Sequence, residues 1–139
     1  MNLTNRLEGC VPATIEAIDA VCAEVKTRLI ADIVRKEQFI IELLLREALL
    51  NAVVHGSKDL IDGFIHYDVE RTADSVRARV TDRGSGFNWS DWEMPDETPL
   101  TSSGHGLQIL HLYADSIAFN PMGNEMEWIG KFRKGEVHA

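Results

Sequence analysis

Residues 63–82 read GFIHYDVERTADSVRARVTD, and the class of fold depends on the pattern within them. Apolar and polar side chains alternate through Gly63–Arg71 and again through Ser75–Asp82, a period of two that is typical of strands with one buried face. The polar segment Thr72–Asp74 separates the two runs, so the sequence predicts an antiparallel hairpin. Asp82 has the parity of the apolar positions of its strand, and its side chain is therefore expected on the core side.

Two helices are predicted before this hairpin. Apolar residues recur with a helical period through Ala13–Ile33, and Pro12 and Thr14 lie where the start of a helix favours proline and a capping hydroxyl. A second amphipathic segment covers Glu37–His55, and Gly56 follows it at the position that commonly ends a helix. Both helices are expected to pack on the sheet.

The remaining segments complete the sheet and add one helix. A weak alternation favours an edge strand at Leu3–Leu7, and Asn88–Ser103, rich in polar residues and proline, is predicted to be a long surface loop. The sequence then predicts a helix over Gly106–Ala114 and strands over Ser116–Asn120 and Glu125–Arg133. Segregated helices and antiparallel strands indicate an α+β fold. We expect a two-layer α/β sandwich with a mostly antiparallel sheet and helices packed on one face, not a doubly wound parallel sheet.

Length and composition limit the class of protein. With 139 residues, 45% of them hydrophobic, we expect one domain over residues 1–139. No apolar run approaches the roughly 20 residues that span a bilayer, and Met1–Cys10 lacks the pattern of a signal peptide. A cytoplasmic protein without a membrane partner is therefore expected. The cysteines, Cys10 and Cys22, have no metal-ligand spacing and are expected to be reduced thiols.

The formal net charge of −8 limits the ligands. Affinity for nucleic acid comes mainly from Lys and Arg that neutralise phosphates, so direct binding to nucleic acid is not expected. The same charge would repel a nucleotide. Such a ligand would therefore need a divalent cation and backbone N–H groups to supply positive potential.

The predicted second helix carries two polar stripes. The first can face solvent and consists of Gln38, Glu42 and Arg46. The second lies among apolar residues and consists of Glu47, Asn51 and His55. A carboxylate in the second stripe would be partly desolvated, which costs free energy unless it is paired or hydrogen-bonded, so the stripe suits a site. The alternative is that Glu47 and Asn51 bond to a neighbouring loop. His55 also suits a helix C-terminus and is assigned no catalytic role.

A second motif, Asp82-Arg83-Gly84-Ser85-Gly86, follows the hairpin. An inward carboxylate at a strand end can accept a hydrogen bond from the exocyclic amino group of a base. Gly84 and Gly86 lack a Cβ atom and let the backbone approach a flat ring closely. The motif therefore fits base recognition, and it equally fits an ordinary Asp-Arg-Gly turn after a strand.

A third motif, Ser103-Gly104-His105-Gly106-Leu107, leads into the predicted helix over Gly106–Ala114. The first N–H groups of a helix have no intrahelical partner, so a glycine-containing loop at this place suits phosphate binding. A loop that ends in a Ser or Gly N-cap gives the same pattern, and this alternative stays open.

The three motifs occur in an order that resembles the GHKL, or Bergerat-fold, ATPases. The N box corresponds to residues 45–52, the G1 box to residues 82–86 and the G2 box to residues 104–107. Within that superfamily, residues 46–56, REALLNAVVHG, resemble the signature of the anti-sigma-factor serine kinases, in which Glu-Ala-x-x-Asn-Ala is followed by His-Gly. The resemblance implies a histidine-kinase-like ATPase domain.

The resemblance implies ATP and Mg²⁺ as ligands and gives roles to the site residues. Asn51 would coordinate Mg²⁺, Asp82 would bind the adenine amino group, and Glu47 would orient the attacking hydroxyl. The other nucleotide contacts would come from the glycine motifs, through Gly84, Gly86, Ser103, Gly104, His105, Gly106 and Leu107.

The resemblance also implies partners. The family phosphorylates a serine or threonine of an anti-anti-sigma protein with the STAS fold, otherwise sequesters a sigma factor, and usually forms a homodimer. The predicted edge strand at Leu3–Leu7 is the expected seam of such a dimer, because an unpaired strand edge favours pairing.

Two features depart from the family pattern. The predicted loop Asn88–Ser103 contains no Lys or Arg, which many relatives place there to meet the γ-phosphate. Residues 123–127 lack the threonine that many relatives place there to assist the adenine-binding aspartate. A kinase is therefore weighed against a non-catalytic binding module, in which Trp89, Trp92 and the acidic loop form a protein interface. A third hypothesis is an α+β domain that binds no ATP.

Overall fold

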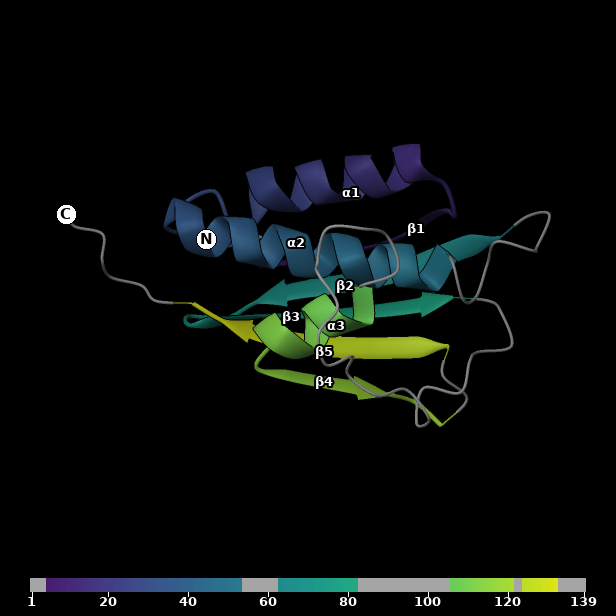
Figure 1. Ribbon diagram of the computed structural model, residues 1–139. Helices are drawn as coiled ribbons and strands as arrows, with labels where there is room; N and C mark the ends of the chain where they lie inside the picture. Colours follow the sequence, from purple (N-terminus) through teal and green to yellow (C-terminus); the bar gives the residue numbers. More distant parts are fainter. Residues whose placement is uncertain (1–4, 54–62, 83–105, 122–123, 133–139) are drawn as a thin grey trace.

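Three helices and five strands form in the part of the chain that the computed structural model describes, residues 5–53, 63–82, 106–121 and 124–132 (Figure 1). In chain order they are β1 (Arg6–Pro12), α1 (Ile15–Arg28), α2 (Arg35–Ala52), β2 (Phe64–Arg71), β3 (Ser75–Asp82), α3 (Gly106–Tyr113), β4 (Ser116–Phe119) and β5 (Glu125–Lys131).

The strands form one sheet in the order β1-β2-β3-β5-β4, and each pair of neighbours is antiparallel. The helices lie on one face of this sheet, as Figure 1 shows, and α2 packs directly against α1, α3 and β3. The predicted α+β architecture, two layers with an antiparallel sheet, is confirmed.

The β2–β3 hairpin follows the sequence prediction closely. β3 has the predicted bounds, and β2 begins one residue later than predicted. Ile65, Tyr67 and Val69 are the buried positions that the alternation indicates along β2. The backbone N–H of Thr72 donates to the carbonyl oxygen of Ser75 at 2.8 Å and closes the turn. Local alternation and polar turn residues are therefore sufficient to locate this hairpin.

β1 lies further along the chain than the predicted edge strand. It spans Arg6–Pro12 instead of Leu3–Leu7, and its central residue, Gly9, lies opposite Tyr67 of β2. A Cβ atom at Gly9 would lie 2.9 Å from the hydroxyl oxygen of Tyr67, so the tyrosine ring covers the place of a side chain. Because the ring of Tyr67, a residue distant in sequence, packs over Gly9, the alternation within residues 6–12 does not by itself predict where β1 lies.

The helix α1 begins at its predicted cap. Thr14 is the N-cap residue, and its Oγ1 accepts a hydrogen bond from the backbone N–H of Ala17 at 3.1 Å. Pro12 is the last residue of β1 and does not begin the helix. The capping hydroxyl is thus the signal that fixes the start of α1.

The C-terminal end of α1 comes five residues before its predicted end, at Arg28. The chain then turns toward α2, and two side chains satisfy the carbonyl oxygens of this turn. Arg71 Nη1 donates to Leu29 O and Gln38 Nε2 donates to Ile30 O, each at 2.8 Å. Because these carbonyl groups have partners outside the helix, a further helical turn is not needed to pair them.

The helix α2 covers Arg35–Ala52, whereas the sequence predicts Glu37–His55. Val53 is its C-cap residue, and its backbone N–H bonds to carbonyl groups of the last turn. The predicted helix end at His55 and Gly56 lies outside the described residues. Among the described helices, none combines the length and the apolar character needed to cross a bilayer.

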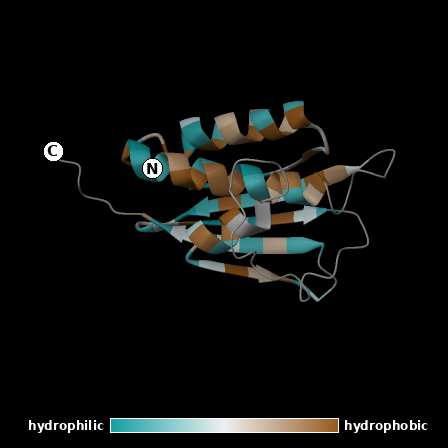
Figure 2. Cartoon of the chain, viewed as in Figure 1, coloured by the Kyte–Doolittle hydropathy of each residue, from teal (hydrophilic) through white to brown (hydrophobic). Residues whose placement is uncertain are grey.

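The hydrophobic core lies between the helices and the sheet. α2 supplies Leu44, Ala48 and Leu49, and β5 supplies Trp128, all without exposed surface. Figure 2 shows hydrophobic and hydrophilic residues alternating along the elements, as expected for a two-layer fold. Since α2 contacts the other two helices as well as the sheet, its orientation is firmly set.

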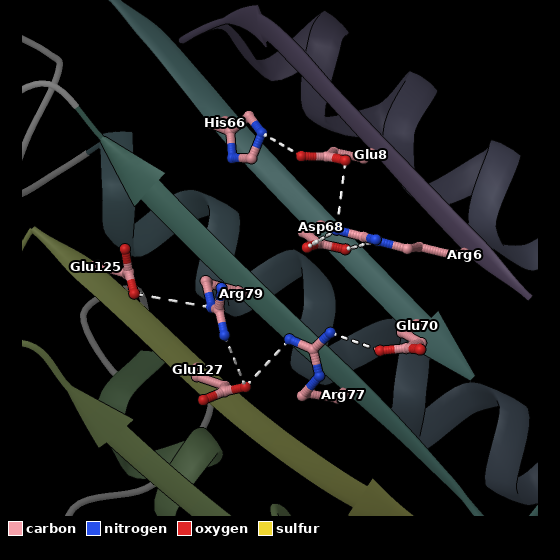
Figure 3. Close-up of polar contacts among 9 residues, drawn as sticks. All are labelled: Arg6, Glu8, His66, Asp68, Glu70, Arg77, Arg79, Glu125 and Glu127. Atoms are coloured by element: carbon pink, nitrogen blue, oxygen red, sulfur yellow. Dashed lines mark hydrogen bonds and ion pairs between the residues drawn. The ribbon is translucent and has the colours of Figure 1, made fainter. Parts of the chain in front are cut away.

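The open face of the sheet carries a network of ion pairs (Figure 3). Arg6 donates to both carboxylate oxygens of Asp68 at 2.8 Å, and this guanidinium lowers the pKa of Asp68 below its ordinary value. The other ion pairs are Arg6–Glu8, Arg77–Glu70, Arg77–Glu127, Arg79–Glu125 and Arg79–Glu127, and His66 Nε2 lies within hydrogen-bond distance of Glu8 Oε2, at 3.1 Å. They join β1, β2, β3 and β5 on the face opposite the helices.

Candidate functional site

Glu47 and Asn51 lie on one face of α2. They are four residues apart, which places them one above the other on a helix, and both residues are half-buried. The core side of α2 is a different face, formed by residues such as Leu44, Ala48 and Leu49. Because that side is closely packed, α2 cannot roll on the sheet without exposing apolar surface, and Glu47 and Asn51 are held in position.

The carboxylate of Glu47 has an unusual electrostatic environment. Burial raises its pKa above the ordinary value, and the positive charge of Arg46 acts in the opposite direction. Within the described part of the chain, no residue makes a hydrogen bond or an ion pair with the Glu47 side chain. A carboxylate kept partly out of water without a partner is a stronger base than an exposed glutamate, which suits proton abstraction.

The sequence predicts that the other polar stripe of α2 faces solvent, but in the structure this stripe is half-buried. Its three members contact α1 or the turn after it: Arg46 with Asp19 at 2.6 Å, Glu42 with Lys26 at 4.0 Å, and Gln38 with the carbonyl oxygen of Ile30 at 2.8 Å. Periodicity alone does not distinguish a side covered by the polar edge of another helix from a side open to water. Glu47 and Asn51 lie on a different side of α2 from this contact with α1.

Asp82 is the last residue of β3 and is 7% exposed, in agreement with its predicted inward orientation. The β4–β5 turn fixes its backbone, since the N–H of Asp82 donates to Asn124 O at 2.9 Å and Asn124 Nδ2 donates to Asp82 O at 3.3 Å. Asn120 Nδ2 in turn donates to Asn124 Oδ1 at 2.7 Å. These two asparagines hold the strand end that carries the buried carboxylate.

Asn120 and Asn124 are absent from the predicted site residues. Their only signal in the sequence is that Asn-Pro and Gly-Asn dipeptides bound residues 120–124, which marks a turn but does not show what the turn contacts. The contact with Asp82 exists because β5 pairs with β3, where Thr81 lies opposite Glu125. Pairing between strands so distant in sequence is not visible in either segment alone.

The elements that carry the predicted site residues converge at one end of the fold. The C-terminal ends of α2 and β3 lie at the same end of the two layers (Figure 1), and α2 packs against both β3 and α3. α3 begins at Gly106, as predicted, with Leu107 in its first turn. Asn51 and Asp82 are therefore carried to the same end by elements in direct contact.

Part of the predicted site lies outside the described residues. This holds for the predicted nucleotide-binding residues Gly84, Gly86, Ser103, Gly104 and His105, for His55, and for the predicted loop over Asn88–Ser103. Their predicted roles stay predictions.

The site also has to be compatible with Mg²⁺. The described residues contain no group of three or more His, Cys, Asp or Glu side chains that could hold a metal ion. In nucleotide sites Mg²⁺ takes few protein ligands, because water and phosphate oxygens complete its octahedron. The half-buried Asn51 offers an amide oxygen of the required hard type, so the residues present fit a metal ion carried largely by a nucleotide.

Comparison with known proteins places these features in a family. A search among curated proteins finds no match to the chain. The family model of the histidine kinase-like ATPase domain matches residues 11–128, a span that includes α2, β3, α3 and the residues Glu47, Asn51 and Asp82. Since the match covers most of the sequence, the chain belongs to the histidine kinase-like ATPase domain family.

Proposed function

We propose that this ATPase domain binds ATP with Mg²⁺ and acts as a protein serine/threonine kinase. In this proposal it is an anti-sigma factor that binds a sigma factor, phosphorylates a STAS-fold anti-anti-sigma protein, and so switches between two partners. Membership of the ATPase domain family supports nucleotide binding. The likeness of residues 46–56 to the anti-sigma-factor kinases supports a protein substrate.

The observation that carries the proposal is the half-buried Glu47, whose pKa is raised by burial. In the proposed reaction a serine or threonine hydroxyl oxygen attacks the γ-phosphorus. The bond from this phosphorus to the β,γ-bridging oxygen breaks, and ADP leaves. The hydroxyl proton passes to the Glu47 carboxylate and then to water. A raised pKa makes Glu47 a stronger base for this step than an exposed glutamate.

Two further residues bind the nucleotide in this proposal. The carboxylate of Asp82 accepts a hydrogen bond from the adenine amino group, and its burial strengthens that bond relative to water. Asn51 ligates Mg²⁺, which when bound neutralises charge on the phosphates. The chain has a formal net charge of −8, so this neutralisation is needed for a triphosphate to approach.

The proposal includes a homodimer, with β1 in place of the predicted strand Leu3–Leu7 as its seam. β1 is an edge of the sheet, and its register on β2 turns the N–H groups of Arg6, Glu8 and Cys10 away from β2. Antiparallel pairing with a second copy about Leu7 places Arg6 of one copy opposite Glu8 of the other. Light scattering should give a dimer mass for the wild type and a monomer mass for Glu8→Arg. A dimer mass for the variant would exclude this seam.

The test of the kinase is transfer of labelled phosphate from ATP to STAS-fold proteins of the same organism. Glu47→Gln should lower the rate by about 10²–10⁴-fold and leave Mg·ATP binding intact. Asn51→Ala should lose the Mg²⁺-dependent part of nucleotide binding, and transfer with it. Glu42→Gln is the matched control, because this acid lies on the same helix beside Lys26 and should keep the wild-type rate. Full transfer by Glu47→Gln would exclude Glu47 as the base.

A non-catalytic binding module is the second candidate function. It is favoured by the sequence of residues 88–103, which contains acidic residues and two tryptophans but no Lys or Arg to meet a γ-phosphate. The module predicts that the wild type binds a STAS-fold partner by calorimetry and transfers no phosphate at saturating Mg·ATP. The kinase predicts transfer under the same conditions.

A further inference from the structure

The outward face of α2 carries apolar side chains that do not enter the core. Phe39 is 65% exposed, the most exposed of the large hydrophobic residues in the described part of the chain. Leu43, one turn later, is half-buried and belongs neither to the core nor to the residues packed against it. A single exposed apolar side chain is common on a protein surface, so Phe39 marks a contact only together with its neighbours along the helix.

These apolar residues are aligned with the candidate catalytic residues. Phe39, Leu43, Glu47 and Asn51 follow one another at intervals of four residues, so they form one continuous stripe along α2. At 1.5 Å per residue, Phe39 lies about 12 Å from Glu47 along the helix axis. An extended peptide covers that distance with about four residues.

A positive charge lies at the start of the same stripe. Arg35 and Lys36 precede Phe39 by four and three residues, which places them beside it on the helix surface, and both are exposed. In the described chain neither has an ion-pair partner. Cations in the first turn oppose the helix dipole, and the N-cap residue Val34 makes no side-chain hydrogen bond, so neither charge is explained by the stability of α2.

A second helix, α3, also carries exposed apolar side chains. It packs against α2 and runs back along it, so that its last turn lies beside the N-terminal half of α2 (Figure 1). Leu112 and Tyr113 in that turn are 54% and 46% exposed.

We propose that this surface, defined by Arg35, Lys36, Phe39 and Leu43, docks the protein that accepts the phosphoryl group. The order along α2 is cation, apolar residue and candidate base. The matching partner presents a carboxylate, then an apolar side chain, then a hydroxyl about 12 Å from that side chain. The inference rests on the proposed kinase function and assigns the surface that holds its protein substrate.

The experiment measures transfer kinetics with a STAS-fold protein that the wild type phosphorylates. Phe39→Ala should raise the KM for this acceptor by about tenfold or more, as expected for an aromatic anchor. The kcat at saturating acceptor and the Kd for Mg·ATP should stay at wild-type values, because Phe39 lies about 12 Å from Glu47 along the helix axis. Ile15→Ala is the matched control, since Ile15 is 54% exposed on α1 and lies outside the stripe.

Charge variants test the electrostatic part of the surface. The double substitution Arg35→Gln with Lys36→Gln should raise the acceptor KM at low salt and make it less dependent on salt concentration. An unchanged KM in Phe39→Ala, with the wild type active, would overturn the docking surface and leave the kinase standing. Weaker sigma-factor binding without a change in acceptor KM would also overturn it. No transfer by the wild type would overturn both the kinase and the docking surface.

Discussion

Replacing Trp128 tests how the sheet holds α2. This residue lies at the centre of β5 and has no exposed surface. Its ring and Leu44 of α2 both lie over Gly130, where an added Cβ would be 3.3 Å from Trp128 Cζ3 and 3.4 Å from Leu44 Cδ1. The indole N–H is buried, and no described residue accepts a hydrogen bond from it. Two substitutions can therefore separate the packing of the ring from the cost of its polar group.

The two substitutions should differ widely in their effect. Trp128→Ala removes the whole ring and should cost about 3–5 kcal/mol, a large share of the roughly 5–15 kcal/mol that stabilises a domain. Trp128→Phe keeps the six-membered ring and loses about 2 kcal/mol of apolar burial. Removal of the unpaired N–H offsets about 1–3 kcal/mol of that loss. The free energy of unfolding of Trp128→Phe should therefore lie within about 1 kcal/mol of the wild type.

Urea unfolding followed by circular dichroism measures both free energies. At roughly 4 °C per kcal/mol, Trp128→Ala should also lower Tm by about 12–20 °C. Phe39→Ala is the control, because truncation of an exposed side chain should change stability by no more than about 0.5 kcal/mol. If Trp128→Phe were as destabilising as Trp128→Ala, the unpaired N–H could not be a cost, and this account of the core would be wrong.

Three further predictions concern titratable groups. Transfer should need the ionised form of Glu47, so the rate should rise with pH through a midpoint above the ordinary 4.5, and Glu47→Gln should lose this dependence. Ellman's reagent at pH 8 should label the exposed Cys10 in the native protein and reach Cys22 only in denaturant, because burial raises the pKa of Cys22 to about 11. The hydrogen bond to Arg6 lowers the pKa of Asp68 below its ordinary value of 3.8. The ionised Asp68 therefore stabilises the fold fully at a pH above 3.8, and this stabilisation is lost as the pH falls through the lowered pKa. Below pH 4, the unfolding free energy of Asp68→Asn should therefore change less with pH than that of the wild type. A larger change with pH in the variant than in the wild type would contradict this prediction.

The parts of the fold that the sequence predicted well are those with local causes. Alternation places both strands of the β2–β3 hairpin, and the parity of Asp82 predicts its burial, because strand geometry sends every second side chain to the same face. Thr14 identifies the start of α1, because a cap acts within one helical turn. These features depend on residues close together in the chain.

The features that the sequence did not predict have causes distant in the chain. In β1, the ring of Tyr67 packs over Gly9. At the end of α1, Arg71 donates a hydrogen bond to the carbonyl oxygen of Leu29. The clamp of Asn124 on Asp82 depends on the pairing of β5 with β3. For the candidate site, the half-burial of Glu47 agrees with prediction, whereas the covering of the other polar stripe by α1 does not. Periodicity gives the faces of a helix but not which neighbour covers each face.

We claim that Asn51 and Asp82 serve one nucleotide site, and a titration with a fluorescent ATP analogue distinguishes this from two unrelated roles. The wild type should bind the analogue saturably and need Mg²⁺ for full affinity. In Asn51→Ala, Mg²⁺ should no longer raise the affinity. Asp82→Asn should weaken binding by roughly 10–100-fold with or without Mg²⁺, as expected for a lost charged hydrogen bond. No saturable binding by the wild type, or wild-type binding by both variants, would contradict the claim.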